Sequence, residues 1–150
     1  MKILITGAAG FIGSSLYKKL NKKDKYEFIL IDDLSKGLIS NLPKNTKLIQ
    51  RDISKINCYN NIENVDAIIH FAGQSSGERS FIDPIRDLNS NYISTINTLN
   101  FAKKCNCRTI VFASSMSVYG DNNRGPLTNY GINKLAAETY LKINSENKIN

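Results

Sequence analysis

The side chains best suited to chemistry stand in the second half of this chain. Tyr130 and Lys134 are four residues apart in a segment with helical periodicity, so both lie on one face of a helix. Ser115 belongs to a run of serines after an apolar segment, where hydroxyl groups can point into the same crevice. A phenol has a pKa of about 10, and a neighbouring ammonium lowers that pKa by stabilising the phenolate. The three residues predict acid–base chemistry on an alcohol or a ketone.

A glycine pattern near the N-terminus predicts a nucleotide site. Gly7, Gly10 and Gly13 separate an apolar run at residues 2–6 from an amphipathic segment, a layout typical of strand, tight turn and helix. Glycine lets the backbone approach a pyrophosphate, which is stabilised by the positive end of the helix. Asp32 ends the next apolar run, where a carboxylate can accept hydrogen bonds from an adenosine ribose. Because these features occur in order, we interpret them as a dinucleotide site. A tyrosine–lysine pair in a chain with such a site is favoured as functional over an ordinary pair of surface residues.

Apolar runs and helical patterns alternate along the chain and define the elements that position these residues. We expect strands at residues 2–6, 26–32, 46–50, 65–71 and 108–114. We expect helices at residues 11–23, 54–62, 84–104 and 129–146, with Asp83 as the N-cap and Pro84 as the first position of the third. Near-continuous apolar strands separated by helices predict an α/β protein. Its expected fold is a three-layer Rossmann-type arrangement with a parallel sheet of order 3-2-1-4-5.

Composition narrows the class of protein further. The 150 residues are 41% hydrophobic and 22% charged, which suits one globular domain, and no apolar stretch is long enough to predict a membrane span. The net charge of +7 comes from lysines scattered over helix ends, so we expect no nucleic-acid partner. The N-terminus shows no secretory signal.

The cysteines and the single histidine predict no metal centre. Cys58, Cys105 and Cys107 are an odd number without a CxxC pair, which favours reduced thiols and a cytoplasmic location. Cys105, Cys107 and His70 together do not have the number or the spacing of ligands that a zinc site needs. His70 itself stands in an apolar run, so a partly buried histidine with a hydrogen bond at a strand end is favoured over a catalytic one.

The motifs together resemble those of the extended short-chain dehydrogenases/reductases, in the NAD-dependent epimerase/dehydratase family. The matching segments are residues 6–13, 32–34, 51–53, 70–73, 114–120 and 130–138. They extend over almost the whole chain. The resemblance implies NAD as cofactor and a nucleotide-sugar substrate.

The resemblance also implies a role for each matching residue. The family's pyrophosphate-binding turn matches Gly7, Gly10, Phe11, Ile12 and Gly13, and its acidic residue that binds the adenosine ribose matches Asp32. The positions that flank adenine match Asp52 and Ile53. The segment beneath the ribose and phosphates matches Phe71, Ala72 and Gly73. Tyr130 matches the family's base, Lys134 its ribose-binding lysine, and Ser115 its partner of the substrate oxygen. Asp33, next to Asp32, would repel a 2′-phosphate, so NAD is expected over NADP.

Within the family, the residues after Ser115 favour one reaction. Sugar-nucleotide dehydratases carry an Asp-Glu pair there, whereas this chain has Met116 and Ser117. We therefore favour a 4-epimerase that works through a 4-keto intermediate; a reductase or a decarboxylase stays open. Family members are about twice as long, so we expect an incomplete NAD-binding domain at residues 1–150 without the substrate domain, and a non-catalytic remnant is the alternative.

A homodimer is the expected assembly. The helices at residues 84–104 and 129–146 are neighbours on one sheet face, and in the family this pair forms a four-helix contact. The apolar residues available for it are Tyr92, Ile96, Leu99, Tyr140 and Leu141. The alternative is that these side chains pack inward.

Overall fold

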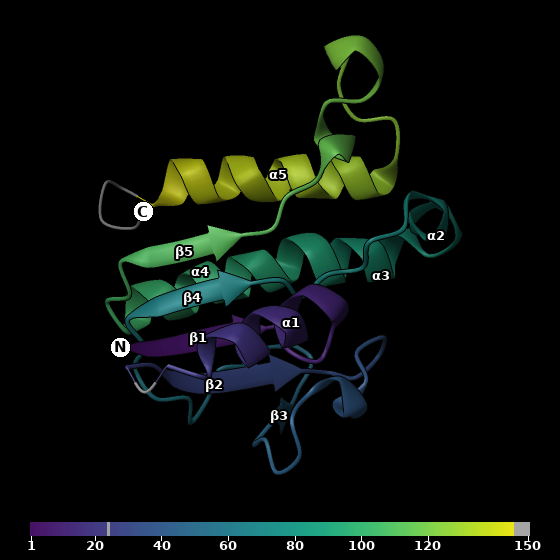
Figure 1. The fold of residues 1–150 in the computed structure, drawn as a ribbon. Coiled ribbons are helices and arrows are strands. Elements are labelled where there is room, and N and C mark those ends of the chain that lie inside the picture. The colour runs from purple at the N-terminus through teal and green to yellow at the C-terminus, as the bar shows by residue number, and fades with distance from the viewer. Residues whose placement is uncertain (24, 146–150) are drawn as a thin grey trace.

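A single parallel sheet organises the computed structural model, which describes residues 1–23 and 25–145. Its strands are β1 (Lys2–Thr6), β2 (Glu27–Asp32), β3 (Ile49–Gln50), β4 (Ala67–His70) and β5 (Thr109–Phe112). They lie in the order β3-β2-β1-β4-β5, and every neighbouring pair is parallel (Figure 1). The predicted strand order and Rossmann-type fold are confirmed.

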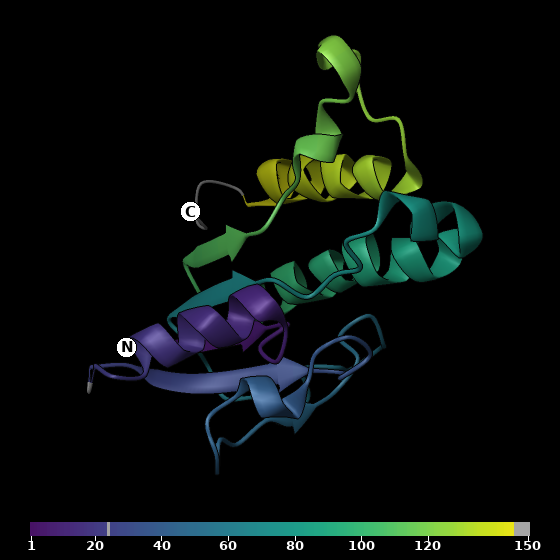
Figure 2. The same cartoon turned by 45° about the vertical axis from the view of Figure 1, so that its right-hand side comes forward.

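Helices cover both faces of this sheet. They are α1 (Phe11–Leu20), α2 (Gly77–Ile82), α3 (Pro84–Leu88), α4 (Ser94–Lys104) and α5 (Asn129–Asn144), with 3-10 turns η1 (Ile39–Asn41), η3 (Met116–Val118) and η4 (Asp121–Asn123). One core cluster joins Ile3 and Ile5 to Tyr17 of α1, and a second joins Leu4 and Ile68 to Phe101 of α4. Alternate residues of the strands thus serve opposite faces. Beyond α4, α5 runs alongside it (Figures 1 and 2).

The short helix expected at residues 54–62 was wrong, because that segment is a series of turns. Asn57 and Asn61 have φ angles of 59° and 61°, left-handed conformations that interrupt a right-handed helix. In addition, Asp52 accepts hydrogen bonds from the backbone N–H and the hydroxyl of Ser54, which makes a local turn instead. Sequence reasoning also missed α2, which Ser76 caps by accepting from the Arg79 N–H.

The helical run expected at residues 84–104 is confirmed, but it is not α-helical throughout. Between α3 and α4 lies η2 (Asn89–Ile93), a π-helical segment. Pro84 is at the start of α3 and the Asp83 carboxylate accepts from the Arg86 N–H, so the predicted cap is confirmed. The hydroxyls of Ser94 and Thr95 donate to the carbonyls four residues earlier, a bonding pattern that distorts helices.

Several predicted ends were too long. β3 has two residues in place of 46–50, α1 ends at Leu20 in place of 23, and residue 146 of the last predicted helix lies outside the described residues. Within the described part of the chain, no helix is long and apolar enough to cross a membrane, and no group of His, Cys, Asp and Glu side chains could hold a metal ion. Cys58, Cys105 and Cys107 are buried and free.

Candidate active site

The glycine turn between β1 and α1 is closed too tightly for side chains. Gly7 has a φ of +67°, and a Cβ there would lie 2.6 Å from the Ala72 nitrogen. A Cβ on Gly13 would lie 2.3 Å from the Gly7 carbonyl oxygen, so the first turn of α1 presses against the end of β1. Gly10 is the N-cap and supplies no capping side chain. The first N–H groups of α1 therefore have no partner within the helix and can bind an anion.

Phe11 and Ile12 project from that first turn of α1. Their exposed fractions are 85% and 59%, large values for apolar residues in a turn that is otherwise tightly packed. Their side chains are free to contact a ligand that lies on the helix N-terminus.

Asp32 stands at the carboxyl end of β2, beside the glycine turn. One carboxylate oxygen accepts from the Ala9 N–H at 2.9 Å, and the other accepts from the Leu34 N–H at 2.8 Å. Each oxygen keeps acceptor capacity for a further donor such as a ribose hydroxyl. Asp33 is exposed, and one of its oxygens accepts from the Ser35 N–H at 2.8 Å. The two acidic residues make this end of the site negative.

Asp52 and Ile53 follow β3, the strand next to β2. The Arg51 N–H donates to the Asp32 carbonyl at 3.0 Å, which carries this segment to the same edge as the glycine turn. The Ile53 side chain is buried in the core, and its carbonyl accepts from Asn97 at 2.9 Å. The structure thus brings the segment to the site edge but directs the Ile53 side chain inward.

Residues 71–73 follow β4 and pack against the glycine turn. Phe71 and Ala72 donate their N–H groups to the Thr6 carbonyl and hydroxyl, at 3.1 and 3.3 Å. A Cβ on Gly73 would lie 2.6 Å from Asn91 Oδ1 and 3.4 Å from Lys134 Nζ. Gly73 therefore packs against the Asn91 amide oxygen, with the Lys134 ammonium next to it, and a side chain at this position would collide with Asn91.

Lys134 of α5 is a buried cation at the end of β5. Its Nζ donates to the Ala113 carbonyl at 2.9 Å and lies 4.6 Å above the centre of the Phe112 ring. Burial lowers the pKa of Lys134 to about 8, although the charges of Asp87 and Glu138 act to raise that pKa. A fraction of the ammonium is therefore uncharged in mildly alkaline solution.

Tyr130 and Ser115 come to the same edge of the sheet as Lys134. Tyr130 is buried in the first turn of α5, which Thr128 caps by accepting from the Gly131 N–H. A Cβ on Gly131 would lie 2.4 Å from the Ser117 carbonyl oxygen, so this turn packs directly on the segment that contains Ser115. Ser115 donates its hydroxyl to that of Ser117. No hydrogen bond joins the three predicted residues to one another in the described part of the chain.

Asn91, in η2, is a site residue that sequence reasoning missed. It is fully buried, and its Nδ2 donates to the Gln74 carbonyl at 3.0 Å and to Asp87 at 2.9 Å. Among the described residues, Asn91 Oδ1 has no hydrogen-bond partner. A buried acceptor without a donor is costly, so this oxygen lacks a hydrogen bond that most buried acceptors make. The available signal was spacing, since Asn91 lies in register with Leu88 and Thr95 on one helical face.

His70 is a structural residue, as predicted. It is 1% exposed, and its two ring nitrogens lie 2.7 Å from the Thr6 hydroxyl and 3.1 Å from the Thr95 hydroxyl. Burial, with a smaller contribution from Lys134, lowers the pKa of His70 to about 3. The neutral ring therefore joins β4 to β1 and α4, and it is more deeply buried than the sequence indicated.

These features fit a bound dinucleotide. The uncapped start of α1 suits a pyrophosphate, and the Asp32 carboxylate suits a ribose. The Lys134 ammonium and the Asn91 Oδ1, which lie next to Gly73, add hydrogen-bond donors and an acceptor at the same edge of the sheet.

The fold and these residues define a Rossmann-type dinucleotide-binding protein. The chain belongs to the NAD dependent epimerase/dehydratase family, whose model matches residues 3–150, and its cofactor is NAD. It is 35% identical, over 94% of its length, to half of a Methanocaldococcus jannaschii protein to which UDP-glucose 4-epimerase activity is attributed. It is 36% identical, over 81% of its length, to 35% of UDP-glucuronic acid decarboxylase 6 of Arabidopsis thaliana.

A solved structure agrees with these sequence relatives. The complex of the Thermus thermophilus UDP-glucose 4-epimerase with NAD superposes with a TM-score of 0.86 at 27% identity, covering 97% of this chain and 51% of that one. The chain therefore spans about half the length, or less, of the relatives that it matches.

Proposed function

We propose that this chain forms the cofactor-binding and catalytic part of a sugar-nucleotide 4-epimerase. The observation that carries the proposal is the hydrogen bond from Lys134 Nζ to the Ala113 carbonyl at 2.9 Å. It ties α5 to the end of β5, so that Tyr130, Lys134 and Ser115 come to the same edge of the sheet as Gly73. Acid–base groups beside a nicotinamide site suit the reversible oxidation of a sugar alcohol.

In this proposal Tyr130 moves the proton. Its phenol oxygen takes the proton of the substrate C4 hydroxyl and later returns it, while Ser115 hydrogen-bonds the same substrate oxygen. The Lys134 ammonium binds the cofactor ribose and stabilises the phenolate. A bound NAD would supply reversible hydride transfer at C4. The sugar turns over between the two transfers, which inverts C4.

Two alternatives have specific support. A decarboxylase would use the same three residues, and one relative bears that name. Met116 and Ser117 do not favour a dehydratase, because a thioether and a hydroxyl group cannot replace a carboxylic acid and a carboxylate as acid and base. A protein that binds the cofactor without turnover is the second alternative, because Tyr130, Lys134 and Ser115 share no hydrogen bond with one another in the described part of the chain.

The test compares cofactor binding with turnover. The purified chain is titrated with NAD, and a fusion to the C-terminal half of the Methanocaldococcus jannaschii relative is incubated with NAD and UDP-galactose. We expect UDP-glucose to form with the fusion, measured by NMR. NAD binding without any conversion of UDP-hexoses by the fusion would favour the binding-only alternative, and loss of carbon dioxide from UDP-glucuronic acid would favour the decarboxylase.

We also propose that the site selects NAD over NADP. Asp32 and the exposed Asp33 put two carboxylates at the edge where a 2′-phosphate would lie, and like charges repel. Titration of the chain with both cofactors should give tighter binding of NAD. Asp33→Ser should reduce the difference in affinity between NAD and NADP. NADP binding that equals or exceeds NAD binding would contradict this selection.

A further inference from the structure

Asp87 of α3 is a buried carboxylate that the proposed mechanism does not use. It is 0% exposed, and three side-chain amides donate to it. Its Oδ1 accepts from Gln74 at 2.6 Å and from Asn91 at 2.9 Å, and its Oδ2 accepts from Asn133 at 2.6 Å. No cation lies within ion-pair distance of it among the described residues. A carboxylate that only accepts hydrogen bonds behaves as the ionised form.

These hydrogen bonds join three segments next to Gly73 and Lys134. Gln74 follows the Gly73 backbone, Asn91 belongs to η2, and Asn133 precedes Lys134 in α5. A rigid cluster at this point fixes how α5 sits against the loop after β4. Both oxygens of Asp87 accept hydrogen bonds, and such buried bonds favour one arrangement of the three segments.

Asp87 also decides which atom of Asn91 faces Gly73 and Lys134. Both N–H groups of Asn91 point to acceptors, Asp87 Oδ1 and the Gln74 carbonyl. A flipped amide would place its oxygen against both of them, which is unfavourable. The Asn91 oxygen is therefore turned toward Gly73 and Lys134, where it has no partner in the described part of the chain.

We propose that Asp87 is a positioning residue: its buried carboxylate orients the Asn91 amide oxygen toward Gly73 and Lys134 and supplies the negative charge that balances the Lys134 ammonium. The inference rests on the proposed role of Lys134 in the epimerase site. It assigns to Asp87 no contact with substrate or cofactor.

The charges around Lys134 support this assignment. Asp87 reaches it from α3 and Glu138 from α5, and both favour the ammonium, whereas burial of the side chain disfavours it. His70 of β4 is neutral and Tyr130 is the remaining titratable neighbour on α5. Asp87 is the fully buried carboxylate of the pair, so its charge is less screened by water than that of Glu138.

The decisive variant is Asp87→Asn, which keeps the shape and removes the charge. The Lys134 ammonium is titrated by NMR in lysine-labelled protein, with Lys134→Arg to assign its signal. We expect the pKa of Lys134 to fall below that of the unchanged chain and NAD affinity to fall about tenfold, as for one lost hydrogen bond to a charged group. The matched control is Asp83→Asn, the same change at the exposed cap of α3, which should alter neither value.

A double variant protects the test against simple unfolding. Asp87→Asn combined with Asn133→Asp reverses one hydrogen bond, leaves the acceptors of Gln74 and Asn91 in place, and returns a carboxylate to the cluster. It should return the Lys134 titration to the original pH or above, even if the single variant fails to fold. Titration below the original pH in the double variant overturns the inference, as does a folded Asp87→Asn that titrates and binds NAD like the unchanged chain. Neither result depends on sugar turnover, so the proposed function is judged separately.

Discussion

At the scale of single residues, the site combines a buried cation with neutral neighbours. Lys134 is held by one carbonyl and an aromatic ring, while His70 nearby is kept neutral by burial. A positive charge in such surroundings acts over a longer range than it would in water. This arrangement suits a lysine that stabilises a phenolate.

The role of Tyr130 can be tested by removing one oxygen. In the proposed epimerase fusion, Tyr130→Phe should lower kcat by about two to four orders of magnitude, because only the proton-transferring group is lost. NAD affinity should change little. Tyr26→Phe, at the opposite end of the sheet, is the control and should keep normal turnover. Near-normal turnover of Tyr130→Phe would remove this residue from the mechanism.

His70 predicts a specific loss of stability in acid. Its pKa is about 3 in the folded chain against an ordinary value of 6.5, so the unfolded chain binds more protons between these pH values. The free energy of unfolding should therefore fall as the pH is lowered from 6.5 toward 3. Urea unfolding at several pH values measures this slope. His70→Gln should be less stable at pH 7 but should lose less on acidification; an equal slope would contradict the assignment.

At the scale of elements, the strands meet the site through close backbone contacts. The glycine turn presses on the segment after β4, and the start of α5 presses on the segment after β5. In both places a Cβ would collide with backbone atoms, which cannot move aside as side chains do. These contacts explain why Gly13 and Gly131 stand in the first turns of α1 and α5.

Gly13 and Gly10 offer a matched pair for testing this packing. A Cβ would lie 2.3 Å from the Gly7 carbonyl oxygen at Gly13 but 3.2 Å at Gly10. Gly13→Ala should destabilise the chain by about 1–3 kcal/mol, the usual cost of overpacking, and weaken NAD binding. Gly10→Ala should cost less stability. Thermal unfolding compares the two, and equal losses would show that the packing of α1 is looser than described.

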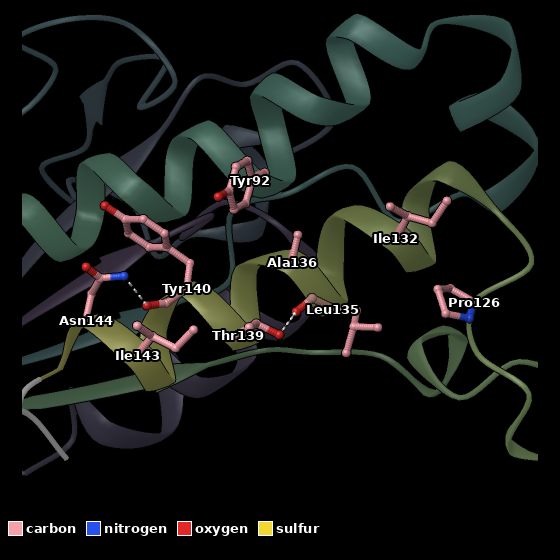
Figure 3. A pocket seen from close by; sticks show the side chains of 9 residues that line it. All are labelled: Tyr92, Pro126, Ile132, Leu135, Ala136, Thr139, Tyr140, Ile143 and Asn144. Carbon is pink, nitrogen blue, oxygen red and sulfur yellow. Dashed lines mark hydrogen bonds between the residues drawn. The ribbon is translucent and has the colours of Figure 1, made fainter.

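At the scale of the whole molecule, an apolar groove crosses the outer face of α5. Its volume is about 430 Å³, and Figure 3 shows its lining from α5, Tyr92 of η2 and Pro126. The rings of Tyr92 and Tyr140 meet edge to face at 5.9 Å between centres. Leu99, by contrast, is fully buried, so that part of the apolar stripe packs inward. We propose that the outer face of α4 and α5 is a homodimer contact.

Sedimentation across a concentration series tests this assembly. Ile143 is 70% exposed at the groove, and Ile143→Glu should shift the chain toward the monomer by burying a charge at the contact. Ile56→Glu, at an 89% exposed residue of the turns after β3, is the control and should change nothing. A chain that sediments as a monomer at every concentration would contradict the dimer.

The sequence by itself determined the sheet and the residues at its edge. Strand order followed from apolar runs alternating with helical patterns, and the turn at Gly7 followed from glycine spacing, because both depend on local periodicity and backbone freedom. The parallel sheet then brings strand ends together, so Asp32, Ser115 and Lys134 reach one edge although they are far apart in the chain.

Only the tertiary structure decided how the polar interior is arranged. The turns at residues 54–62 depend on left-handed asparagines, and η2 depends on hydroxyls that bond backbone carbonyls, neither of which alters hydrophobic periodicity. Asp87 and Asn91 looked like ordinary helix residues in the sequence. Their burial, and the hydrogen bonds that Asp87 accepts from amides of the loop after β4, η2 and α5, exist only once these segments pack together.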